Sequence, residues 1–113
     1  METAAMIAAV HKYVEAFETG SMDLIREIYS SDARVEDPVG SEVHDGIEAV
    51  CAFYEGALGS GAKLVLTGTP RCAGNSVAFP FKAQMPGMHV EIIDVFEFND
   101  VGKVVSMKAY WSS

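Results

Sequence analysis

The spacing of apolar residues changes near the middle of the chain, from a period of about 3.6 to a period of two. Before residue 62, apolar side chains recur three and four residues apart, which is the repeat of one helix face. The three stripes are Met6, Val10, Tyr13, Val14 and Phe17; Leu24, Ile25, Ile28 and Tyr29; and Ile47, Val50, Cys51, Tyr54 and Leu58. They predict three helices, with Thr3, Ser21 and Asp45 as candidate N-caps.

From Lys63 onward, apolar and polar residues alternate, which is typical of strands with one buried face. The turn residues Pro86-Gly87 and a polar turn at 99–102 separate the longest stretches. The residues predicted to face inward are Leu64 and Leu66; Val77, Phe79, Phe81, Ala83 and Met85; Val90, Ile92, Asp94, Phe96 and Phe98; and Val105, Met107, Ala109 and Trp111. Helices followed by such a meander predict a single α+β domain over residues 1–113, with a curved antiparallel sheet wrapped over three N-terminal helices. The mouth of such a cone is a natural ligand pocket.

Composition narrows the class of ligand. The 113 residues are 50% hydrophobic and 21% charged, with a formal net charge of −8. This charge disfavours a nucleic acid or a membrane surface as the partner. The first residues lack the basic region of a signal peptide, and no apolar run approaches the ~20 residues of a membrane span. We therefore expect a cytoplasmic protein with a neutral or weakly polar small-molecule ligand.

One acid lies on the apolar side of its strand. Asp94 is in phase with Ile92 and Phe96, whereas Glu91 and Glu97 are on the other side. A period of two therefore points Asp94 into the core. Burial disfavours a carboxylate, so we expect a raised pKa and a retained proton, which makes the group a hydrogen-bond donor. A purely structural hydrogen bond is the alternative.

A second acid ends a shorter alternating stretch. Asp37 shares a face with Ala33 and Val35, and Pro38 then ends the pairing. A carboxylate at the rim of an apolar pocket is suited to general-base chemistry. The alternative is that Asp-Pro is a simple turn element.

Three tyrosines lie on the inner stripes, one on each predicted helix: Tyr13, Tyr29 and Tyr54. Taken singly, each can be a core residue with a hydrated hydroxyl. Together with two inward acids, they favour a shared hydrogen-bond network in one cavity. The three histidines are scattered, and neither cysteine has a neighbouring base, so we expect no metal site. Nucleotide and flavin motifs are also missing from the sequence, so we expect no cofactor.

Several segments, taken in order, resemble bacterial ketosteroid isomerase (steroid Δ5-isomerase). They are Tyr13-Val14-Glu15, Tyr29 before 30–33, Val35-Glu36-Asp37-Pro38, Ala52-Phe53-Tyr54, Ile93-Asp94-Val95 and Met107-Lys108-Ala109-Tyr110-Trp111. This resemblance covers nearly the whole chain. It implies the cystatin-like cone that is shared with nuclear transport factor 2, and a homodimer.

The resemblance also implies roles for individual residues. Asp37 is the base that moves a proton from C4 to C6 of a 3-oxo-Δ5-steroid. Tyr13 and protonated Asp94 donate hydrogen bonds to the C3 oxygen. The supporting residues are Tyr29 and Tyr54 behind Tyr13, and Trp111 beside Asp37. The steroid-lining residues are Phe79, Phe81 and Met107.

Two other functions remain possible on the same cone. The first is a polyketide cyclase or dehydratase, although relatives of that kind commonly use an inward histidine that this sequence lacks. The second is a non-catalytic module that binds a small apolar ligand. Such a module has little use for an acid within an apolar strand.

Overall fold

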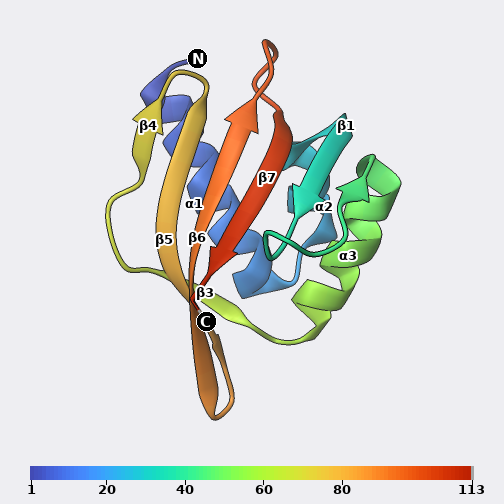
Figure 1. The fold of residues 1–113 in the computed structure, drawn as a ribbon, viewed down its shortest axis with the longest axis vertical. Helices are drawn as coiled ribbons and strands as arrows, with labels where there is room; N and C mark the ends of the chain where they lie inside the picture. The colour runs from blue at the N-terminus through green and yellow to red at the C-terminus, as the bar shows by residue number, and fades with distance from the viewer. Residues whose placement is uncertain (113) are drawn as a thin grey trace.

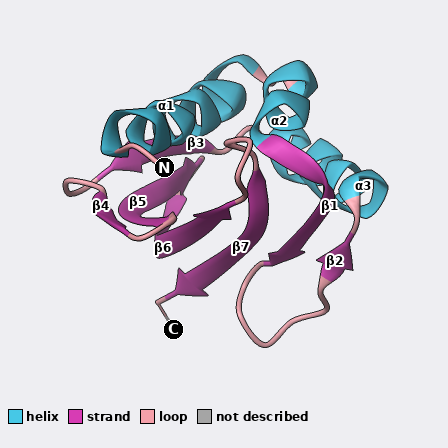
Figure 2. Cartoon of the chain, turned by 90° about the horizontal axis from the view of Figure 1, so that it is seen from above, coloured by secondary structure: helices cyan, strands magenta, loops and turns pink. Residues whose placement is uncertain are grey.

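Three helices cover one face of a curved sheet. The computed structural model describes residues 1–112. The helices are α1 (Thr3–Thr19), α2 (Met22–Ile28) and α3 (Ile47–Gly59). Seen from above, all three lie on the same side of the strands (Figure 2). Their buried residues, which include Val10, Tyr13, Ile25 and Tyr54, come from the stripes that the spacing predicts.

The sheet is built mainly from an antiparallel meander. The strands are β1 (Tyr29–Glu36), β2 (His44–Asp45), β3 (Lys63–Leu66), β4 (Arg71–Ala73), β5 (Ser76–Met85), β6 (Met88–Phe98) and β7 (Val104–Trp111). Their order is β2-β1-β7-β6-β5-β3, with β4 paired to β5. The long strands β5, β6 and β7 cross the centre of the molecule side by side (Figure 1). The α+β prediction is confirmed, although β1 pairs with β7 in parallel.

Three local predictions are wrong. Tyr29 does not continue the second helix: its backbone is extended, with φ −94 and ψ 146, and it pairs with Val104 of β7. Strand pairing has overridden the helical spacing at this point, yet the side chain of Tyr29 is still buried. Asp45 does not cap α3, because it pairs with Arg34 in the sheet and Gly46 occupies the N-cap with φ 92. Thr3 is already helical, and Glu2 precedes it without a side-chain cap.

A bulge changes the phase of the last strand. Glu97 pairs with Ser106 and Phe98 pairs with Val104, so Val105 has no partner between them. Val104 is therefore fully buried, and Val105 is only partly buried. Beyond the bulge, Met107 and Ala109 face inward as the alternation predicts.

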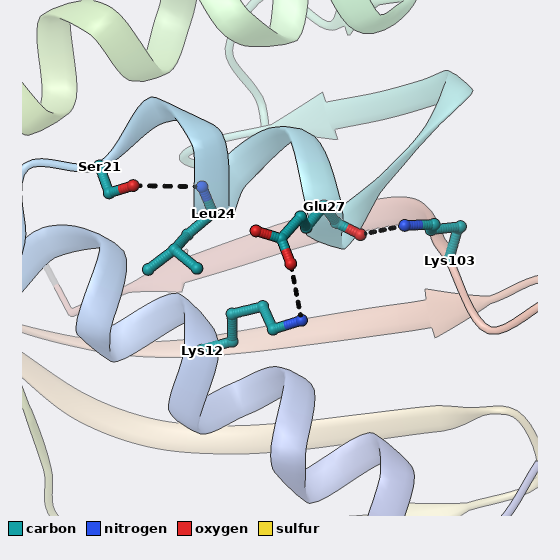
Figure 3. Close-up of polar contacts among 5 residues, drawn as sticks. All are labelled: Lys12, Ser21, Leu24, Glu27 and Lys103. Atoms are coloured by element: carbon teal, nitrogen blue, oxygen red, sulfur yellow. Dashed lines mark hydrogen bonds and ion pairs between the residues drawn. The ribbon is translucent and has the colours of Figure 1, made fainter.

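Polar contacts join the helices to the far end of the sheet. Lys12 on α1 pairs with Glu27 on α2 at 3.4 Å, and Lys103 donates to the backbone carbonyl of Glu27 (Figure 3). Ser21 caps α2 as predicted, because its hydroxyl accepts from the N–H of Leu24 at 3.3 Å. These contacts link α1 to α2, and α2 to the turn between β6 and β7.

Candidate active site

A largely apolar cavity of about 250 Å³ lies between the helices and the inner face of the sheet. Its wall consists of Tyr13, Phe17, Asp37, Phe53, Ala57, Ser60, Ala62, Leu64, Phe81, Ala83, Met85, Val90, Ile92 and Trp111. Most of these side chains are aliphatic or aromatic, and the acid among them is Asp37. Such a wall suits a rigid hydrocarbon ligand with few polar groups.

Asp37 lies just beyond the end of β1, half-buried at the cavity wall. The indole N–H of Trp111 donates to its carboxylate, with 2.8 Å between Nε1 and Oδ1. Burial raises the pKa of Asp37 above its ordinary value, and the Trp111 hydrogen bond and the charge of His44 oppose this rise. A carboxylate with these properties is a stronger base than one in water, and the indole fixes its orientation.

Asp94 lies in the middle of β6, between Phe79 of β5 and Ala109 of β7. It is 1% exposed, and both of its carboxyl oxygens lack a hydrogen-bond partner among the described residues. Burial raises its pKa well above the ordinary value, and the charge of Asp37 raises it further, while Tyr13 has a smaller, opposite effect. These effects favour the neutral acid, whose O–H is free to donate. The prediction that Asp94 points inward is confirmed.

The three tyrosine hydroxyls form a chain. The hydroxyl oxygen of Tyr54 lies 3.0 Å from that of Tyr13 and 2.5 Å from that of Tyr29. Burial raises the pKa of all three phenols well above the ordinary value, so they stay protonated. In each of these two hydrogen bonds either hydroxyl can be the donor. Tyr13 also lines the cavity, so it connects this chain of hydroxyls to the site.

The structure brings most of the predicted site residues together, but not all of them at the cavity wall. Tyr13, Asp37, Phe81 and Trp111 line the cavity. Phe79, Met107 and the predicted donor Asp94 do not line it, and all three are buried in the core. The Phe79 ring lies behind Tyr13, with 5.9 Å between the two ring centroids, and Met107 pairs with Phe96.

The sequence patterns do not identify some of the residues that line the cavity. Phe53 comes from α3, and Ser60 and Ala62 come from the turn after it. Phe53 is adjacent to the buried Tyr54, so its side chain lies at the margin of the helix stripe. Residues at a stripe margin are the usual lining of a cavity beside a helix, and this is the signal that could have identified Phe53.

Neither a metal cluster nor a membrane span is found in the described part of the chain. Among residues 1–112, no group of three or more His, Cys, Asp and Glu side chains could hold a metal ion. None of the helices described is long and apolar enough to cross a bilayer. Cys51 and Cys72 are both free thiols. The polar groups that face a ligand are therefore carboxyl, phenol, indole and hydroxyl groups.

Three helices on a curved sheet, with an apolar cavity between them, define an α+β cone of the nuclear transport factor 2 type. The chain belongs to the family of the SnoaL-like domain, whose model matches residues 10–107.

Two known proteins are similar to the chain over nearly its full length. A steroid Delta-isomerase of Nocardioides simplex is 34% identical over 114 residues, which cover 97% of this chain and 92% of that protein. Among solved structures, the epoxide hydrolase/cyclase-like enzyme SalBIII, described for pyran ring formation in the polyether salinomycin, superposes with a TM-score of 0.85. It is 26% identical, and the match covers 95% of this chain and 90% of that one.

Proposed function

We propose that this protein is a steroid Δ5-isomerase that converts 3-oxo-Δ5-steroids into 3-oxo-Δ4-steroids. The Asp37 carboxylate removes a proton from C4, and the electron pair moves toward the C3 oxygen to form a dienolate. The protonated Asp37 then returns the same proton to C6, and the double bond moves into conjugation with the ketone. Atoms and charge balance within the substrate and one carboxyl group.

The observation that carries this proposal is the placement of Asp37 and Tyr13 on one apolar cavity, together with the buried, unpartnered Asp94, whose pKa both residues influence. Proton removal next to a ketone develops negative charge on the oxygen, which needs donors already in place. The hydroxyl of Tyr13 and the neutral acid of Asp94 are suitable donors. The similarity to a steroid Delta-isomerase supports an isomerase activity.

The direct test is turnover of 5-androstene-3,17-dione, followed by the absorbance of the conjugated enone product. We expect rapid isomerisation without an added metal or cofactor. Product formation at the uncatalysed rate, with a folded protein by circular dichroism, would contradict the proposal.

Removal of the Tyr13 hydroxyl tests the donor role. Tyr13→Phe is expected to lower kcat by about 10²–10³-fold, because one donor to the developing oxyanion is lost. The ring would still pack edge-on against Phe79 and Phe96, so the fold should persist. Steady-state kinetics and a thermal melt measure the two effects. The matched control is Tyr110→Phe on the outer face of the sheet, which should retain wild-type kcat.

A cyclase or epoxide-opening reaction is the second candidate, and the similarity to SalBIII favours it. An acid that donates a proton to an epoxide oxygen and a base that activates a hydroxyl would use the same two aspartates. An epoxy alcohol of similar size to a steroid, incubated with the protein and analysed for a cyclic ether, tests this reaction. Cyclisation in the absence of steroid turnover would favour the second candidate over the first.

We also propose that the protein forms a homodimer, in which the partner subunit covers the outer face of the sheet. Ile93 and Tyr110 pair across β6 and β7 and are 47% and 48% exposed, and Val65 on β3 is also exposed. A cluster of exposed apolar side chains on a sheet is typical of a protein interface. Ile93→Lys should convert a dimer into monomers in light scattering. Val101→Lys, in a turn where Val101 is 80% exposed, should not change the mass.

A further inference from the structure

His44 lies on the same face of the sheet as Asp37. In the antiparallel pairing of β1 with β2, His44 is opposite Val35, and paired residues point to the same side. Val35 is fully buried, so His44 is directed inward as well, and the expectation that the sequence has no inward histidine is wrong. Asp37, two residues beyond Val35, follows on this side of the strand.

The imidazole of His44 is held by an aromatic contact. Its ring lies against that of Phe53, with 4.6 Å between the centroids and 31° between the planes. Phe53 and Asp37 both line the cavity. His44 therefore contacts a residue of the cavity wall without lining the cavity itself.

The other ionisable groups around His44 leave Asp37 as its main counter-charge. Arg34 and Asp45 alternate with Val35 and His44, so they lie on the opposite face, where they form an ion pair at 3.9 Å. Glu36 also alternates with Asp37 and accepts from the N–H of Gly40 at 2.8 Å. The ionisable residues of α3 are Glu48 and Glu55, which are exposed, and Cys51 and Tyr54, which are buried, and Glu42, two residues before His44, is exposed as well.

We propose that His44 is a positioning residue for Asp37. His44 supports Phe53 at the cavity wall, and its positive charge favours the ionised form of the Asp37 carboxyl group. The role in turnover rests on the proposed function of Asp37, whereas the effect on its ionisation does not. The charge of His44 lowers the pKa of Asp37 against the rise that burial causes. Burial makes the base strong, and His44 together with Trp111 keeps it in the ionised form.

The indole of Trp111 offers a readout that does not need a substrate. Trp111 is the single tryptophan of the chain and donates to Asp37, so its fluorescence should change when Asp37 takes up a proton. An Asp37→Asn variant, which lacks this transition, assigns it. The ¹³C shift of the Asp37 carboxyl group gives the same midpoint by a second route.

His44→Phe is the decisive variant, because it removes the charge and keeps an aromatic ring against Phe53. We expect the midpoint to move to higher pH in His44→Phe, because the charge that lowers the pKa of Asp37 is lost. His44→Arg should restore it, and His11→Phe, an exposed histidine on α1, should leave it unchanged.

The acid limb of the pH profile of kcat/KM should move in the same direction in His44→Phe if Asp37 is the base. An unmoved fluorescence midpoint in His44→Phe, or an equal shift in His44→Arg, overturns the role of His44. A shifted midpoint in a protein that does not turn over any 3-oxo-Δ5-steroid leaves the role of His44 intact. That result would contradict only the proposed function.

Discussion

Asp37→Asn is expected to lower kcat for a 3-oxo-Δ5-steroid by about 10²–10⁴-fold, the usual contribution of a positioned general base. The amide oxygen can still accept the hydrogen bond of Trp111, so the cavity wall should keep its shape. The amide cannot take up the C4 proton, so binding should persist while the chemical step fails. The enone absorbance gives kcat, and fluorescence quenching of Trp111 by a product steroid gives the affinity.

The neighbouring carboxylate provides the control. Glu36→Gln removes a charge one residue away, and its amide oxygen can still accept from the N–H of Gly40. We expect wild-type kcat for this variant, because the side chain of Glu36 lies outside the cavity wall. A similar loss in both variants would point to a general effect of charge or of loop structure, and an unchanged kcat in Asp37→Asn would remove Asp37 as the base.

We expect the two raised pKa values to set the lower and upper limits of the pH range of the proposed activity. Burial raises the pKa of Asp37, so the base is lost as the pH falls through this raised value. Burial raises the pKa of Asp94 further, so the neutral donor is lost as the pH rises through that value. The two carboxyl groups influence each other, so the apparent pKa values of the two limbs of the pH profile belong to the pair and not to either residue alone.

The parts of the site that were predictable come from single regular elements. Alternation places Asp94 between Ile92 and Phe96 on the inner side of one long strand, and no distant contact can reverse this without a change of register. The helical stripes similarly place Tyr13 and Tyr54 toward the sheet. In each case the local period alone determines the direction of the side chain.

The parts that were not predictable depend on contacts between distant segments. Tyr29 leaves the helical pattern because its backbone pairs with β7, about 75 residues further along the chain. Val105 is displaced by a bulge that depends on the register with β6. His44 meets Phe53 only because β2 returns beside β1. The wall of the cavity likewise depends on how the helices lie on the sheet, so Phe79 and Met107 could not be distinguished from Phe81 by alternation.

Asp94→Leu is expected to stabilise the fold at neutral and alkaline pH and to damage turnover. A buried carboxyl group with two unpartnered oxygens disfavours folding once it must ionise. Its pKa is raised in the native state, so the native protein binds more protons than the unfolded chain and stability falls as the pH rises. The free energy of unfolding falls between the ordinary pKa of aspartate and the raised native pKa of Asp94. The slope in this pH range is at most about 1.4 kcal/mol per pH unit.

Urea unfolding across a pH series measures the pH-dependent contribution of Asp94 to the free energy of unfolding. This pH dependence should be missing in Asp94→Leu and in the isosteric Asp94→Asn. Glu97→Gln, on the solvent side of the same strand, should keep the wild-type slope. The leucine is larger than the acid, so some packing strain will offset its gain, and Asp94→Asn separates the two effects. For turnover, we expect a loss of about 10²–10³-fold in Asp94→Leu and a smaller loss in Asp94→Asn, because an amide N–H can still donate to the dienolate oxygen. A leucine variant that gained stability and kept full turnover would show that this acid serves neither the reaction nor the fold, and the oxyanion would then depend on Tyr13 alone.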